Sequence, residues 1–195
     1  MVEITREELL ARYAAGERDF SGADLRGIDL SELNLSGINL SFAKLINVDL
    51  RRTNLSGANL SGTYIEGTIT DNTILIEANL QDSSIEGLLD SDLRKANLER
   101  MRMFEAPIRN CNMEGVSLRN AELSDVGIRS TNLRNANLEG VKGDFYLMNV
   151  DLTGATGFER KNVWAGYWNL TLPDGTFIAD WETDQIGSVL DLLLG

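Results

Sequence analysis

Carboxylates are the most numerous reactive side chains in this chain of 195 residues, which has 30 Asp and Glu residues but no histidine. Cys111 is its only cysteine. Without histidine a His-based catalytic triad is impossible, and a single cysteine completes neither a Cys/His zinc site nor an internal disulfide. The sequence also has no glycine loop of the P-loop type. We therefore predict that the protein is not an enzyme and has no cofactor and no metal site.

A five-residue period governs where the acidic and amide side chains lie. They stand directly before regularly spaced leucines, as Asp24 does before Leu25 and Asn59 before Leu60. Asp and Asn favour turns because their side chains bond nearby backbone groups. Carboxylates dispersed along a repeat in this way are mostly solvated, which argues against paired acid–base catalysis.

The leucines recur every five residues from Phe20 to Ile85 and, after a shift of phase, from Leu88 to Leu138. Residues five apart on an α-helix lie about 140° apart around the axis, so no apolar stripe would persist. In a strand, an odd period would send alternate leucines to opposite faces. Five residues must therefore form one unit, a short extended piece with a turn. Such a unit buries its apolar side only by stacking on its neighbours.

Two positions of each unit are predicted to point inward, the leucine and the small or β-branched residue two places before it. Cys111 occupies such a small position, so we predict a packed thiol. The predicted core comprises Phe20, Leu25, Leu30, Leu40, Leu60, Leu80, Leu98, Leu118 and Leu138 at the large positions, with Ala23, Ala58, Ala78, Ala96 and Cys111 at the small ones.

Residues 21–27 (SGADLRG) and 55–62 (LSGANLSG) resemble the pentapeptide-repeat family. The opening at residues 8–16 and the LPDG segment at residues 172–175 resemble cyanobacterial members. This resemblance implies an all-β solenoid, a right-handed quadrilateral β-helix with one repeat on each of four sides and about twenty residues per coil. The repeats would make about seven coils on that plan.

The two ends of the chain look like caps on the coils. We predict an N-terminal capping helix in residues 1–17, a β-helix in residues 18–157 and a C-terminal aromatic segment, turn and capping helix in residues 158–195. Thr5 and Glu8 form a capping box, and Gly16 ends the helix. Residues 172–176 form a turn between two short strands. The terminal amphipathic helix is marked by Ile186, Val189, Leu190 and Leu193, and either caps the coil or forms a dimer interface.

The period falters in places where a specific function is expected. Three extra residues fall between Ile85 and Leu93, near residues 86–92, and one residue is missing between Leu138 and Leu147, near residues 139–146. Each break is either a tolerated bulge or a loop that a partner recognises. Apolar residues also replace the usual Asp or Asn near residue 70, through local repacking or as an interface. The candidate interaction residues are Ile69, Ile74, Ile76, Leu88, Leu89, Trp164, Tyr167, Trp168 and Trp181.

A scaffold without catalytic chemistry is best suited to binding another protein, whose identity the sequence does not specify. We predict no direct nucleic-acid binding and no membrane span, since no segment approaches the necessary length. Residues 1–3 lack the features of a secretory signal, so the predicted location is cytoplasmic. A monomer is favoured over a homodimer formed through the C-terminal helix.

The net charge of −12 raises an alternative. Some pentapeptide-repeat proteins resemble duplex DNA and bind type II topoisomerases such as gyrase. Mimicry needs continuous rows of carboxylates that match phosphates. With twenty residues per coil, Arg94, Glu114 and Arg134 would instead alternate in sign down one column, although Asp29 and Asp49 leave a partial acidic face open.

Overall fold

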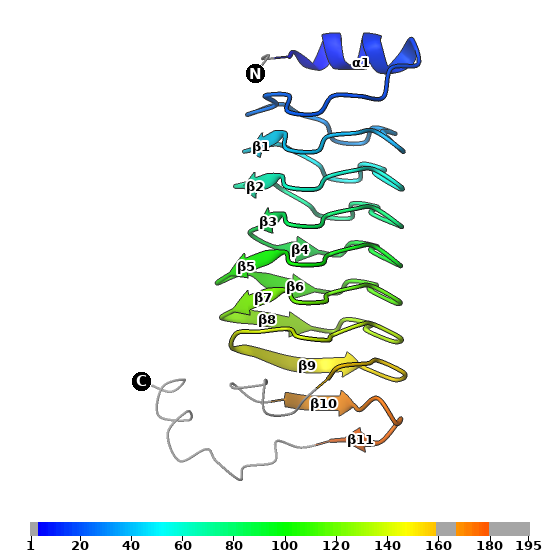
Figure 1. Cartoon of the computed structure of the whole chain (residues 1–195), viewed down its shortest axis with the longest axis vertical. Coiled ribbons are helices and arrows are strands. Elements are labelled where there is room, and N and C mark those ends of the chain that lie inside the picture. The colour runs from blue at the N-terminus through cyan, green and yellow to red at the C-terminus, as the bar shows by residue number, and fades with distance from the viewer. Residues whose placement is uncertain (1–3, 159–166, 180–195) are drawn as a thin grey trace.

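The computed structural model describes residues 4–158 and 167–179 and shows coils stacked beneath an N-terminal helix (Figure 1). Residues twenty apart lie in parallel register, as in the pairs Asp19–Asn39 and Asn34–Asn54. Each side of a coil is one five-residue unit, so four units close one turn. The chain is thus the right-handed, four-sided β-helix that the resemblance to the pentapeptide-repeat family implied.

The leucines of the repeat fill the interior of the coils. Every residue of the predicted core is buried, and Leu25, Leu30 and Leu118 are inaccessible to solvent. The preceding Asp or Asn turns its side chain back onto the backbone. The Ser31 N–H donates to Asp29 Oδ1 at 2.8 Å, and equivalent bonds recur along the stack. These bonds satisfy backbone groups at each turn, which explains why Asp and Asn recur there.

Residues in the left-handed backbone region turn the chain from one side to the next. Gly22 and Gly57 have φ of 65°, and Asn120 has φ of 57°. Glycine and asparagine adopt this region at little cost, which accounts for their frequency two places after the leucine. Phe42 occupies the same conformation with φ of 57°, where a large side chain is unusual.

Two of the four sides form regular parallel sheets (Figure 1). The first, called here the β5 side, contains β1 (Lys44–Ile46), β2 (Tyr64–Glu66), β3 (Ser84–Ile85), β5 (Arg102–Phe104) and β7 (Glu122–Ser124). The second, the β6 side, contains β4 (Leu88–Leu89), β6 (Pro107–Arg109), β8 (Val126–Arg129), β9 (Phe145–Asp151), β10 (Tyr167–Thr171) and the antiparallel β11 (Phe177–Ile178). Most of the isolated bridges between coils lie on the other two sides.

The helix α1 (Arg6–Ala14) caps the first coil. Thr5 Oγ1 accepts the Glu8 N–H at 3.2 Å, as in a capping box, and Leu9 is buried against the coil. The Tyr13 hydroxyl donates to the Ser36 carbonyl at 2.8 Å, so the helix satisfies a carbonyl of the first coil. The predicted N-terminal capping helix is therefore confirmed.

At the other end, β10 and β11 form the predicted hairpin around the turn at residues 172–176. β10 also pairs in parallel with β9 at a spacing of twenty, so the coil stacking continues beyond residue 157. The predicted terminal helix, together with Trp164 and Trp181, lies outside the described residues.

The first break of the period is a deletion, so the predicted insertion of three residues is wrong. Partners across this coil are eighteen apart, as in Ile74–Asp92 and Ser84–Arg102, and return to twenty at Leu88–Ile108. Leu88 is buried in the large inward position only three residues after Ile85. The turn residue and the small inward residue between these two sides are both missing.

The second break shortens its coil by one residue, as predicted. Val126 pairs with Phe145, nineteen residues later. Gly143 lies where the coil before it has Leu123, and a Cβ on Gly143 would fall 2.1 Å from the Leu123 carbonyl oxygen. Phe145 then fills a position that is small in other coils. Glycine is therefore required at residue 143 by close backbone approach.

Candidate interaction surface

The deletion in the first break opens a surface groove at the corner between the β5 and β6 sides. It is lined by Thr68, Ile69, Thr70, Asp71, Glu86, Gly87, Leu89 and Pro107. We call these residues the break groove. It lies where the missing turn would otherwise have filled the corner, so the change of phase and the change of surface have one cause.

Around the break groove, side chains make hydrogen bonds that the backbone makes in regular coils. In earlier coils the N–H at this corner donates to a carbonyl of the next coil, as Gly27 does to Ile46 at 2.9 Å. At the break, Gly67 donates to the Glu86 carboxylate at 2.7 Å instead. Thr70 Oγ1 donates to the Gly87 carbonyl at 3.1 Å. These bonds replace the missing backbone partners, so the groove is formed before any ligand binds.

The apolar candidate interaction residues differ in their exposure to solvent. Ile69 is 43% exposed and Ile74 is 37% exposed. Leu89 and Ile76 are half-buried. Leu88 was expected at the surface but is only 1% exposed, because the deletion puts it in the inward position. Ile69 and Leu89 share the break groove, whereas Ile74 lies on the next side.

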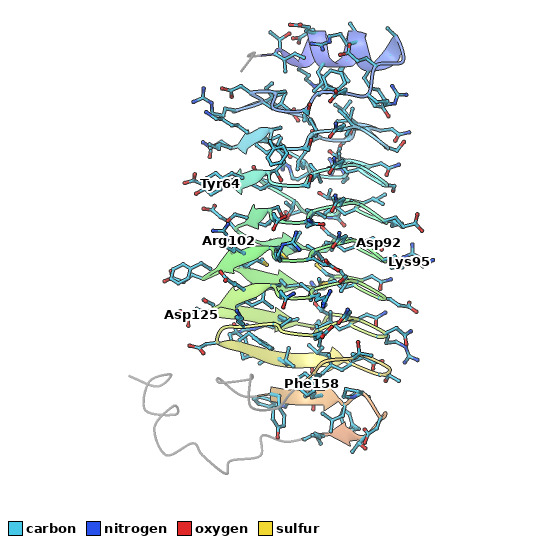
Figure 2. The ribbon with its side chains drawn as sticks, viewed as in Figure 1. Tyr64, Asp92, Lys95, Arg102, Asp125 and Phe158 are labelled. Atoms are coloured by element: carbon cyan, nitrogen blue, oxygen red, sulfur yellow. The ribbon has the colours of Figure 1, made fainter. Side chains whose placement is uncertain are left out.

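Three exposed aromatic residues on or beside the β5 side were missed by the sequence analysis. Phe42, Tyr64 and Phe104 are all at least half exposed. Figure 2 shows Tyr64 and Arg102 along the same edge of the stack. The Phe42 ring lies over Gly62, since a Cβ there would approach the ring to 2.5 Å. Their only signal in the sequence is an aromatic residue at an outward position of the repeat.

The C-terminal aromatic candidates are placed only in part. Tyr167 is half-buried and packs against the core, whereas Trp168 is 49% exposed on β10. Trp168 continues the β6 side and lies in register with Met148 of β9. It is therefore separated from the break groove by several coils.

Ion pairs neutralise many of the acidic side chains locally. Arg26 pairs with Asp24 at 2.7 Å, and Arg51 pairs with Asp49 at 2.5 Å. The hydrogen bonds from these guanidinium groups lower the pKa of both carboxyl groups. A cross-coil pair also forms between Arg119 and the Glu139 carboxylate at 3.2 Å. In the column of alternating signs expected from the sequence, Arg94 pairs with Asp92 and Arg134 with Asp151 instead of with Glu114.

Cys111 is a packed thiol in the small inward position. Its Sγ lies 3.4 Å from the Leu88 carbonyl oxygen. Burial raises the pKa of the Cys111 thiol to about 11, so the thiolate is scarce at neutral pH. Within residues 4–158 and 167–179, no three His, Cys, Asp or Glu side chains gather as a metal site would require.

No helix in the described part of the chain is long and apolar enough to cross a bilayer. The helix α1 has nine residues and covers the end of the coil.

Comparison with known proteins identifies the repeat. The family model described as pentapeptide repeats matches in 8 copies, over residues 19–57, 34–69, 53–87 and 102–140. No curated protein sequence matches the chain significantly.

Solved structures of similar proteins include HetL, a pentapeptide-repeat protein involved in heterocyst differentiation regulation in the cyanobacterium Nostoc. It is 22% identical, with a TM-score of 0.48, over 90% of this chain and 100% of HetL. QnrB1, a plasmid-mediated fluoroquinolone resistance protein, is 16% identical over 91% of this chain and 85% of its own, with a TM-score of 0.42. Rfr23 of Cyanothece is 23% identical over 80% of this chain and 96% of its own, with a TM-score of 0.20.

Proposed function

Since the chain belongs to the pentapeptide-repeat family, we propose that it is a non-enzymatic scaffold that binds another protein through the break groove and the apolar residues beside it. The observation that carries this proposal is the groove itself, where Ile69 and Leu89 replace the polar surface of regular coils. Exposed apolar groups beside a preformed depression are typical of protein–protein contacts.

The solenoid supports such a role through its rigidity. Repeated backbone hydrogen bonds hold together the coils above and below the break. At the break, side-chain hydrogen bonds of Glu86 and Thr70 do the same. A partner that binds here orders few groups of the surface, so the entropic cost of binding is low. Even a small contact area can then give useful affinity. Under this proposal the protein is cytoplasmic and monomeric.

The test is retention of a partner from a cell extract by variants of the full chain. Ile69→Asp combined with Ile74→Asn restores the residue types of the preceding coil, since Ile69 stacks on Asp49 and Ile74 on Asn54. The double variant should fold normally and lose at least tenfold of the retained partner. Asn59→Asp adds the same charge at the equivalent position on another side and should change nothing.

Retention of the partner by the Ile69 and Ile74 double variant at the level of the unmodified chain would reject the break groove as the binding site. Circular dichroism melting of both variants shows whether the fold is intact. A loss of binding by Asn59→Asp of equal size would indicate a general effect of negative charge.

DNA mimicry of the kind that binds gyrase has weaker support. Acidic residues of the first coils, such as Asp24 and Asp49, are paired with arginines of their own coil. A continuous row of uncompensated carboxylates, which mimicry of phosphates needs, is thereby interrupted. We expect no inhibition of gyrase supercoiling at micromolar protein, and inhibition at that concentration would restore this alternative.

A further inference from the structure

Two arginines stand side by side on the β6 side, close to the break groove. Arg109 of β6 and Arg129 of β8 are in register. Among the strand partners and bridges of the described coils, this is the only pair of basic residues. Like charges in register repel each other, so the pair gains nothing from its own geometry.

Eight other arginines of the described residues are paired with carboxylates, whereas Arg6, Arg18 and Arg102 form no ion pair. Neither Arg109 nor Arg129 forms an ion pair with any described residue, although the net charge is −12. Ion pairs are made by Arg12, Arg26, Arg51, Arg52, Arg94, Arg100, Arg119 and Arg134. The unpaired arginines therefore leave charged donors free for an external anionic group.

Tyr146 fixes one of the two arginines in place. Arg129 Nη2 donates to the Tyr146 hydroxyl at 2.8 Å, and its guanidinium carbon lies 5.0 Å from the centre of the Tyr146 ring. The Arg129 Nε is shielded from solvent and has no partner among the described residues. The guanidinium is thus held by the aromatic ring while part of it remains available to a ligand, which reduces the ordering needed on binding.

The surface beside the arginine pair adjoins the break groove through Pro107. Pro107 and Gly127 are in register next to Arg109 and Arg129, and Pro107 also lines the groove. Tyr146 covers Gly127, because a Cβ on this glycine would fall 2.2 Å from the Tyr146 hydroxyl oxygen. Glu105 and Asp125 are exposed just before these two residues, toward the β5 side. The β6 side at these two coils thus has carboxylates at one edge and arginines near the other.

We propose that the partner segment is a helix that carries two carboxylates one turn apart, which bind Arg109 and Arg129. Coils are separated by about 4.8 Å, and residues i and i+3 of a helix rise by about 4.5 Å. Alternate residues of an extended strand are about 6.7 Å apart and match less well. Arginine binds carboxylates through paired N–H donors. Glu105 and Asp125 repel acidic groups at the other edge and thereby orient the helix.

This inference rests on the proposed function, because the apolar face of the same helix would enter the break groove. The test uses a displayed library of 16-residue peptides in a helix-favouring background, selected on the immobilised full chain. Enriched peptides should carry Asp or Glu pairs at i,i+3 or i,i+4. The affinity of the best peptide is then measured for each variant by fluorescence anisotropy.

We expect Arg109→Gln combined with Arg129→Gln to weaken peptide binding at least tenfold. Arg94→Gln with Arg134→Gln removes the same charge on another side and should stay within twofold. Peptides whose Glu residues are changed to Gln should bind the unmodified chain more weakly. Their loss of affinity should equal the loss that the original peptides show on the Arg109 and Arg129 variant. Selection without binders, binders without acidic pairs, or equal losses for both arginine doubles would overturn the proposal.

The same peptides separate this inference from the proposed function. Loss of binding in the Ile69 and Ile74 variant, with none in the Arg109 and Arg129 variant, would retain the break groove and reject the carboxylate pair. The opposite pattern would retain the arginine site and reject the groove as the apolar contact.

Discussion

Leu118 and Arg119 are adjacent in the chain but face opposite environments. Leu118 is inaccessible to solvent in the core, whereas the Arg119 side chain is half exposed and pairs with Glu139. Alternation between inward and outward positions assigns the two residues different physical roles. Residues of the first kind determine whether the coil forms, and residues of the second kind adjust its surface.

We expect Leu118→Asp to destabilise the protein by more than about 3 kcal/mol, because it buries an unpaired charge in the core. Arg119→Ala should leave the free energy of unfolding almost unchanged, because an exposed ion pair contributes little. Denaturant unfolding of both variants measures the difference. Tolerance of both substitutions would show that the inward and outward assignment is wrong.

The Cys111 thiol provides a pH test of burial. Its pKa is raised from 9.0 to about 11 by desolvation, so the folded state keeps the proton longer than the unfolded state. The stability that Cys111 contributes is therefore complete below about pH 9 and is lost as the pH rises toward 11. Cys111→Ala should remove this part of the pH dependence when thermal unfolding is followed from pH 8 to 11. A thiol that reacts quickly with a disulfide reagent in the folded protein at pH 8 would contradict the burial.

At the scale of elements, the first break is a shortened coil with a specific chemical closure. Two residues are missing between Ile85 and Leu88, and Glu86 supplies the acceptor that the backbone no longer provides. Inserting Gly-Ala between Glu86 and Gly87 would restore a turn residue and a small inward residue. The coil would then have the regular spacing of its neighbours, and the break groove would close.

We expect the Gly-Ala insertion to keep the thermal unfolding midpoint of the chain and to abolish partner retention. The midpoint is measured by circular dichroism, and retention by the extract experiment described above. Insertion of the same two residues into the turn at residues 172–176 provides a control for added length. Unchanged partner retention by the variant with a closed break would remove the break from the binding site.

Much of this architecture follows from the repeat, but the break was misread for a definite reason. Three added residues and two deleted residues give the same phase in a five-residue period, so spacing from Ile85 to Leu88 cannot distinguish them. Only pairing across coils, such as Ser84 with Arg102, resolves the difference. Leu88 was placed at the surface for this reason. The Arg109–Arg129 pair did have a signal in the sequence, because the two arginines lie twenty residues apart in coils of regular length.

At the scale of the molecule, the regular coils form a frame and the departures from regularity form its distinctive surface. Hydrogen-bonded turns and local ion pairs recur along the stack and leave few free groups. The break groove interrupts this pattern at one corner, and Arg109 and Arg129 lie two and three coils below Ile69 on the same side. Recognition therefore depends on a small part of a long rod, and most outward positions of the regular coils should tolerate substitution.

Site-specific photo-crosslinking tests the central claim most directly. A photoreactive phenylalanine analogue is placed at Ile69, at the break groove, or at Asn59, on a regular side of the same coil. The complex formed in a cell extract is then irradiated. We expect one protein to be crosslinked from residue 69 and none from residue 59. Crosslinking of that protein from residue 59 with none from residue 69 would place the binding surface on the regular coils and contradict the role assigned to the break.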